Sequence, residues 1–219
     1  TIVAGGSPTA NNSSYASIAC AMDTNNGNIY IAHQTAPPSG KIAVHNPIGT
    51  QIRIFDTTGS ATIRDLCSKG LNGFVRFLFD TGTGVNISMM DMTNGNITAL
   101  VSDAGGAHAP ISMTTYTTGN RYFVSCEGIS GLRRYNSTNN QYMLSPITNN
   151  ALGGVDCKGN RIGIKDDNYV HIAYVGNDSF IIMRSANTGL GGRGSFVFTN
   201  TGFAVGDDNN NVIVLYTEQ

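Results

Sequence analysis

The stretch Leu71-Asn72-Gly73-Phe74-Val75-Arg76-Phe77-Leu78-Phe79-Asp80 indicates the fold, because its pattern recurs along the chain. A polar turn that ends in glycine is followed each time by a short apolar run. The other copies are NNGNIYIAH at Gly27, TTGNRYFVSC at Gly119, CKGNRIGIKD at Gly159 and TNTGFAVGDD at Gly202. Successive glycines are 46, 46, 40 and 43 residues apart. This spacing is the period of a β-propeller blade, about 40–45 residues.

The repeat also continues across the two ends of the chain. From Gly202 to Gln219, and on from Thr1 to Gly27, the count is 44 residues. A closed ring of repeats explains this count, whereas an open solenoid does not. A lone β-sandwich is the main rival fold, but it needs two sheets and leaves the cyclic count unexplained. The sequence therefore predicts an all-β fold, a five-bladed β-propeller of four-stranded blades.

Each period contains four short runs that are rich in β-branched or aromatic residues. In the second period they cover 62–67, 75–80, 86–92 and 96–101, and the turn Asn94-Gly95 is a strong hairpin signal before the last of them. Because no segment has an apolar stripe at the helical spacing, we expect almost no helix.

The fourth strands predict how the propeller closes. Their second residues are Ile52, Ile97, Tyr142 and Phe180, whereas the fifth period ends after its third strand. Ile2 in the run Thr1–Ala4 matches this position, so the N-terminal strand is predicted to complete the last blade and to remove a free sheet edge. We expect one propeller domain over 1–219, with blades at 15–58, 61–103, 109–148, 152–187, and 193–219 plus 1–6.

Composition bears on the class of partner. Charged residues make up 12% of the chain and the formal net charge is −1, so no long-range field attracts nucleic acid or an anionic membrane. No apolar run approaches the ~20 residues of a membrane span. Abundant Asn, Thr, Ser and Gly favour an extracellular or virion-surface location. Asn-x-Ser/Thr sequons point weakly the same way.

Cysteine spacing predicts neither a zinc ribbon nor a redox motif. Cys20, Cys67, Cys126 and Cys157 are far apart, and no C-x-x-C occurs. We expect buried free thiols, which pack as small apolar side chains. A Cys20–Cys67 disulfide is the alternative.

Polar residues recur where the second strand of each period ends, and they are the predicted ligand-binding residues of one loop face. They are His33, Asp80, Glu127, Asp166, Asp167, Asp207 and Asp208. Carboxylates at this place suit sugar hydroxyls or a hard cation, and calcium is the one cofactor they suggest. The alternative is that these residues initiate turns by bonding to nearby backbone.

No catalytic constellation is visible in the sequence. The four histidines are isolated, and no G-x-S-x-G, HExxH or nucleotide-binding glycine motif occurs. Asp65 and Asp156 lie in predicted first strands, where two carboxylates within reach of one bond would suit a glycosidase. We expect no enzyme, with glycoside hydrolysis as the least favoured function.

The segment from Gly73 to Asp80 resembles the G-x-F-x-F-L-F segment of the tachylectin-2-like lectins. That resemblance implies a five-bladed propeller that binds amino sugars. It covers about ten residues of one blade, and the chain has no Trp, which that family uses in each repeat. No binding residue is carried over from it.

These observations together favour a non-enzymatic binding module, secreted or displayed on a surface, that recognises a glycan or a host receptor through its loop face. The alternative is a structural or spike domain of a virion or a cell-surface filament. Either function is compatible with a place in a larger surface protein or assembly, and insertion into a membrane is not expected.

Overall fold

The computed structural model describes residues 16–34, 40–57, 62–80, 84–103, 109–116, 121–127, 132–136, 152–175, 180–190, 194–207 and 212–217. Every regular element in these residues is a β-strand. Among them, accordingly, there is no helix with the length and apolar character needed to cross a membrane.

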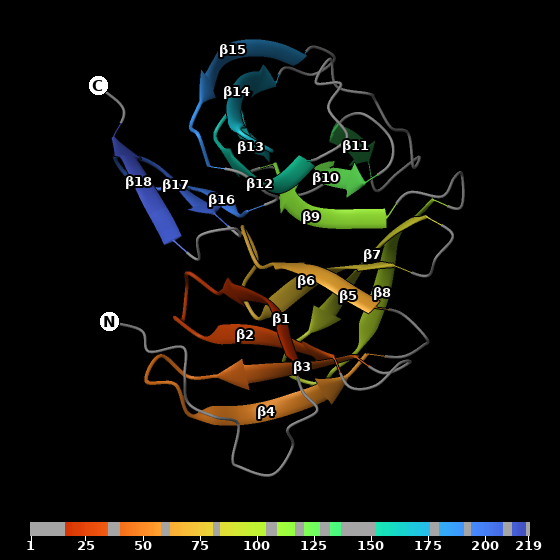
Figure 1. The fold of residues 1–219 in the computed structure, drawn as a ribbon. Coiled ribbons are helices and arrows are strands. Elements are labelled where there is room, and N and C mark those ends of the chain that lie inside the picture. Colours follow the sequence, from red (N-terminus) through yellow and green to blue (C-terminus); the bar gives the residue numbers. More distant parts are fainter. Residues whose placement is uncertain are drawn as a thin grey trace. The chain divides into compact units, whose positions relative to one another are not determined.

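The strands form five antiparallel sheets, and in each sheet neighbours in the sequence are neighbours in space (Figure 1). The first sheet contains β1 (Ala16–Met22), β2 (Ile29–Gln34), β3 (Gly40–His45) and β4 (Gln51–Asp56). The second contains β5 (Thr62–Cys67), β6 (Phe74–Asp80), β7 (Val85–Asp91) and β8 (Ile97–Asp103). The third contains β9 (Ala109–Thr115), β10 (Arg121–Glu127) and β11 (Leu132–Asn136).

The last two sheets follow the same order. The fourth contains β12 (Leu152–Lys158), β13 (Arg161–Asp166), β14 (Tyr169–Val175) and β15 (Phe180–Asn187). The fifth contains β16 (Phe196–Phe198), β17 (Gly202–Asp207) and β18 (Val212–Thr217). The prediction of an all-β, five-bladed propeller is confirmed. The predicted fourth strand at Tyr142 and the closing strand at Thr1–Ala4 lie outside the described residues.

Strand positions in the second blade follow the predicted runs to within two residues. In three blades, the backbone conformation explains why the recurring residue is glycine. Gly27, Gly73 and Gly159 have φ angles of 74°, 72° and 59°. This left-handed conformation costs glycine little and other residues more, so the turn before each second strand favours glycine.

The chain divides into two compact units, one formed by residues 1–81 and 87–99 and the other by 82–86 and 100–219. In the first unit, the core joins β2 and β3 to β5, β6 and β7 and includes Tyr30, Ile42, Leu66 and Phe77. The second unit has two cores. One includes Phe123, Ile162 and Ile164, and the other includes Phe196, Phe203 and Val205.

All four cysteines are free thiols, as predicted, and the alternative disulfide between Cys20 and Cys67 is absent. Cys67, Cys126 and Cys157 are buried, but Cys20 is exposed, so burial was predicted wrongly for that residue. Burial raises the pKa of the Cys126 thiol to about 12. The buried thiols therefore act as small apolar side chains.

Candidate functional site

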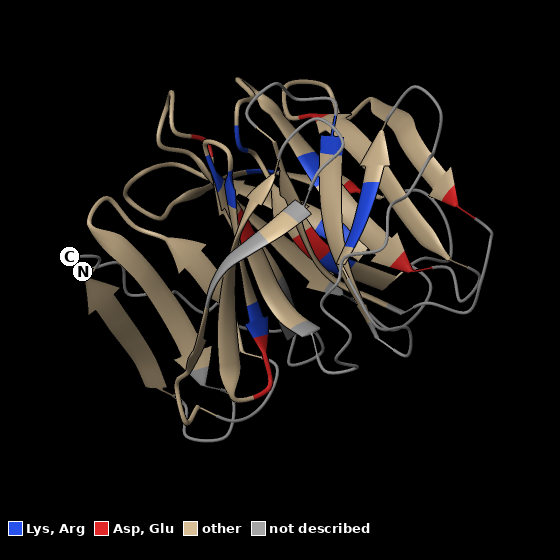
Figure 2. Cartoon of the chain, turned by 90° about the horizontal axis from the view of Figure 1, so that it is seen from above, with Lys and Arg blue, Asp and Glu red and all other residues tan. Residues whose placement is uncertain are grey.

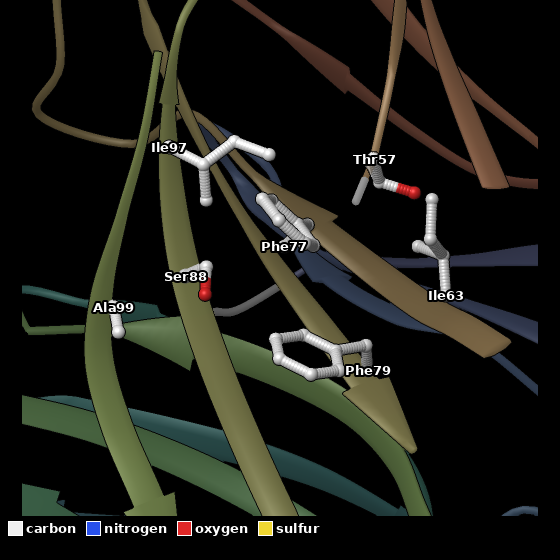
Figure 3. A pocket seen from close by; sticks show the side chains of 7 residues that line it. All are labelled: Thr57, Ile63, Phe77, Phe79, Ser88, Ile97 and Ala99. Atoms are coloured by element: carbon white, nitrogen blue, oxygen red, sulfur yellow. The ribbon is translucent and has the colours of Figure 1, made fainter. Parts of the chain in front are cut away.

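A cavity of about 300 Å³ opens on one face of the second blade (Figure 3). All four strands of that sheet contribute to its wall, as does the segment that follows β4. The lining residues are Thr57, Ile63, Phe77, Phe79, Ser88, Ile97 and Ala99. The volume lies at the lower end of the range for small-molecule sites, roughly 300–1,000 Å³.

Two phenylalanines form the aromatic part of the wall. Phe77 and Phe79 are two residues apart on β6, so both side chains lie on the same face of the sheet. Their ring centroids are 5.5 Å apart, with 32° between the ring planes. Phe77 is buried, whereas Phe79 is half-buried and offers part of its ring to the cavity. The ring can pack against an apolar face of a bound molecule.

Two hydroxyl groups supply the polar part of the wall. The Thr57 hydroxyl donates to the backbone carbonyl of Gly40 at 2.8 Å. Ser88 lies on the opposite side of the phenylalanine rings from Thr57 and Ile63 in Figure 3. Both hydroxyls are uncharged, so the cavity combines an apolar wall with neutral polar groups.

A close approach of the chain shapes one side of this cavity. A Cβ atom on Gly40 would lie 2.7 Å from Cδ1 of Ile63 and 2.8 Å from Oγ1 of Thr57. Both residues line the cavity. Glycine at position 40 therefore allows β3 to pass close enough for Thr57 and Ile63 to hold their places.

The predicted loop-face residues mark a shared structural position. Four of the five second strands end on a carboxylate residue, and the fifth, β2, ends on Gln34, next to His33. The acids are Asp80 in β6, Glu127 in β10, Asp166 in β13 and Asp207 in β17. Asp167 follows in a turn with a φ of 39°. The side chains of Glu127 and Asp207, and the whole of Asp208, lie outside the described residues.

His33 and Asp80 have different surroundings in the first unit. His33 is buried. Desolvation is the main cause that lowers its pKa, the nearby charge of His45 is the second, and both favour the neutral ring. Asp80 is mostly buried and accepts a hydrogen bond from Arg64 at 2.8 Å. In the described part of the chain, no three His, Cys, Asp or Glu side chains are grouped closely enough to hold a metal ion. Calcium binding by the full set of acids stays a prediction.

Asp166 has contacts that the sequence did not indicate. Its Oδ2 lies 3.0 Å from Nε2 of His171, and the other ring nitrogen, Nδ1, lies 2.7 Å from Oγ of Ser185. Asp166 is buried, His171 is half-buried and Ser185 is exposed. We call these three residues, Asp166, His171 and Ser185, the blade-four relay.

Asp65 and Asp156, the predicted glycosidase pair, hydrogen-bond to backbone. Each carboxylate accepts from the N–H of the next residue, at 2.8 Å and 2.7 Å. Asp156 also accepts from Thr114 in β9 at 3.3 Å and from the Phe198 N–H in β16 at 2.9 Å. Asp156 thus connects three blades of the second unit, which gives it a structural role in this fold.

The cavity and the relay include residues that sequence reasoning missed, because neither follows a linear motif. One signal was available for part of the relay. In a hairpin with a two-residue turn after Asp166, that residue pairs with Tyr169, so His171 lies diagonally across on the same face. The contact with Ser185 depends on the β14–β15 register and had no comparable signal.

The low charge seen in the sequence is visible in the structure. Figure 2 shows blue and red positions separated by long uncharged stretches of strand. Several of the charges are paired, such as Arg133 with Asp103 at 3.3 Å. Most of the strand surface drawn in Figure 2 is therefore uncharged.

Comparison with known proteins supports the fold. No family model and no curated protein sequence matches the chain. A structure of a nidogen/laminin complex is similar with a TM-score of 0.61 and 12% identity, over 83% of this chain and 70% of that one. The Cps50 (Swd1) beta-propeller domain of Myceliophteria thermophila is similar with a TM-score of 0.60 and 11% identity, over 92% of this chain and 73% of that one. At this identity the likeness shows the fold alone, and the fold is a β-propeller.

Proposed function

We propose that the chain is a surface-displayed or secreted binding module that recognises a glycan, and that the cavity on the second blade is its binding site. The observation that carries the proposal is the combination of Phe77 and Phe79 with the hydroxyls of Thr57 and Ser88 around one opening. A sugar has apolar C–H faces and many hydroxyls, so it matches a wall that is part aromatic and part neutral polar.

The electrostatics of the cavity support a neutral ligand. None of its lining residues is charged, and the whole chain has a formal net charge of −1. An anionic or cationic ligand would lose its hydration without gaining a counter-charge from this wall. Asp80, at the end of the same strand as the phenylalanines, lies on the predicted loop face and is committed to Arg64. Asp80 itself is not among the residues that line the cavity.

A glycan-array screen of the intact chain, followed by calorimetric titration of the best hit, tests this proposal. Replacing Ser88 by Ala should weaken binding roughly threefold to tenfold, as expected for one lost hydrogen bond of about 0.5–1.5 kcal/mol. Phe79→Ala should weaken binding further, because it removes the accessible aromatic face. Ser195→Ala, at an exposed serine of the second unit, and Tyr174→Ala, at an exposed aromatic residue of β14, are the matched controls.

Two outcomes would contradict the glycan proposal. One is a folded chain that binds nothing on the array above background. The other is a glycan whose affinity is the same for Phe79→Ala, Ser88→Ala and the controls, which would place the binding site elsewhere.

A protein receptor is the second candidate partner, and exposed apolar residues of the first blade favour it. Ile48 is 87% exposed, Ile52 51% and Ile54 47%. Exposed apolar groups of this kind occur at protein interfaces. One of the similar solved structures is that of a nidogen/laminin complex, which is an assembly of proteins. The double variant Ile52→Asp, Ile54→Asp should abolish binding to a protein receptor and leave glycan binding at Phe79 intact.

A further inference from the structure

The blade-four relay joins a buried carboxylate, an imidazole and an exposed hydroxyl in one chain of hydrogen bonds. Asp166 Oδ2 lies 3.0 Å from His171 Nε2, and His171 Nδ1 lies 2.7 Å from Ser185 Oγ. A carboxylate that holds one ring nitrogen makes the other nitrogen available to accept the serine proton. The connectivity is that of an activated serine nucleophile, in which the base is itself oriented by a third group.

The strand pairing brings His171 and Ser185 together. They are directly opposed partners in β14 and β15. The backbone N–H of Thr188 donates to the carbonyl of Asn168, and bonded pairs alternate along an antiparallel ladder. His171 and Ser185 therefore form a non-hydrogen-bonded pair, in which side chains approach more closely. The unbroken register from Tyr169 to Ile172 thus maintains the contact, and the register shift of this strand pair lies beyond it, between Ile172 and Ala173.

The buried carboxylate of Asp166 favours a positively charged partner. The residue is 3% exposed, and its Oδ1 accepts no hydrogen bond within the described residues. A buried carboxylate oxygen without a donor is costly, and such atoms are rare in folded proteins. A positive charge that forms on His171 would be stabilised by this carboxylate. The exposed ring of Tyr169 lies nearly parallel to the imidazole of His171, with 6.1 Å between the ring centroids and 19° between the ring planes.

The outer edge of the blade offers a donor for a developing oxyanion. β15 is the last strand of its sheet. In a non-hydrogen-bonded pair the N–H of Ser185 points away from β14, toward the free edge. A backbone N–H of the nucleophile itself is a common oxyanion donor in acyl transfer. Access from the edge suits small, uncharged esters.

We infer that Ser185 is a nucleophile that reacts with small carboxylic esters, with His171 as its general base and Asp166 as the positioning residue for the imidazole. Ser185 Oγ attacks the ester carbonyl carbon while its proton passes to His171 Nδ1. The tetrahedral intermediate collapses, the C–O bond to the leaving alcohol breaks, and His171 returns the proton to the alcohol oxygen. Water, deprotonated by His171, then attacks the carbonyl carbon of the acyl-serine. The bond from this carbon to Ser185 Oγ breaks, His171 returns the proton to Oγ, and the carboxylic acid is released. This chemistry lies in the second unit and is independent of the glycan proposal.

A fluorophosphonate probe and 4-nitrophenyl acetate test the inference on the intact chain. We expect the probe to label the peptide that contains Ser185, and we expect Ser185→Ala to lose both labelling and ester turnover. Ser195→Ala, at an exposed serine with no histidine partner in the part of the chain that the structure describes, should react like the wild type. His171→Ala should slow both reactions roughly 10²–10⁴-fold, the usual contribution of a general base. Added imidazole should restore part of the rate.

Variants of Asp166 separate positioning from a purely structural role. Asp166→Asn should lower the rate, and Asp166→Glu, which keeps a carboxylate, should recover part of it at an equal unfolding midpoint. Equal reaction rates for the wild type and Ser185→Ala would overturn the inference. So would a His171→Ala variant that labels as fast as the wild type.

Discussion

Two turns of the first unit have nearly the same sequence but different surroundings. One is DTNNGNI at 23–29, between β1 and β2, and the other is DMTNGNI at 91–97, between β7 and β8. Their local hydrogen bonds correspond. In each, the glycine N–H donates to the aspartate carbonyl, and the aspartate side chain accepts from the residue two positions on, at 2.9 Å for Asp23 and 2.8 Å for Asp91.

The two turns differ in what lies around the aspartate. Asp23 is 0% exposed, and its Oδ2 also accepts from the Tyr30 hydroxyl at 3.1 Å and from the Gly73 N–H of the second blade at 3.0 Å. Asp91 receives hydrogen bonds within its own turn, from Thr93 and Asn94. The aspartate of the same local motif therefore bonds within its own turn at position 91, whereas at position 23 it also joins two blades.

The largest expected effect is that of Asp23→Ala. The substitution leaves the buried hydroxyl of Tyr30 and the N–H of Gly73 without their acceptor, and each unsatisfied group costs about 1–3 kcal/mol. We expect a loss of roughly 2–4 kcal/mol of unfolding free energy. Urea denaturation followed by circular dichroism measures it. A loss no greater than that of Asp91→Ala would contradict the blade-joining role.

The glycines of the two turns should show the reverse order. Gly27 and Gly95 both have positive φ, 74° and 80°, so alanine costs about 1–2 kcal/mol at either. An added Cβ would lie 3.1 Å from Pro47 Cγ at position 27, but 2.7 Å from Phe55 Cδ1 at position 95. We therefore expect Gly95→Ala to be the more destabilising variant in the same urea assay. Equal midpoints for both variants would show that Phe55 moves aside freely.

Lowering the pH should reveal the role of the Asp23 carboxylate through a smaller change in stability than the substitutions above. Burial opposes ionisation of Asp23, but hydrogen bonds from Gly73, Asn25 and Tyr30 outweigh it and lower its pKa. The stabilisation is therefore present above the unfolded pKa of about 3.9 and is lost as the pH falls through the lower folded pKa. Asp23→Asn should make the unfolding midpoint less sensitive to acidification from pH 6 to pH 3. A pH profile parallel to that of the wild type would exclude Asp23 as a contributor.

Asp91→Ala should have the smallest effect. Hydrogen bonds from the side chain and backbone of Thr93 lower the pKa of Asp91, but this residue is only half-buried, unlike Asp23. Water can replace each lost partner, so we expect a thermal midpoint close to that of the wild type. A large decrease would mean that the Asp91 carboxylate stabilises more than its own turn.

Much of the fold could be predicted because its signals are local. The run from Thr62 to Cys67 matches β5, and Asn94-Gly95 marks the hairpin that leads into β8. The candidate sites were predicted less well. Asp166 was identified by its place at a strand end, but its partners His171 and Ser185 were not. The lining residue Ser88 was absent from the predicted set, because nothing in its neighbours distinguishes it from other strand serines.

The sequence by itself determined the number of blades, the strand runs and the glycine-ended turns. These depend on residue type and spacing within a few positions, and local backbone preferences are sufficient for them. Tertiary structure alone decided that Asp23 is fully buried while Asp91 is only half-buried, that Ser88 faces a cavity, and that Ser185 meets His171. Each of these depends on strand register or on the neighbouring blade, since the contacting atoms come from residues far apart in the chain.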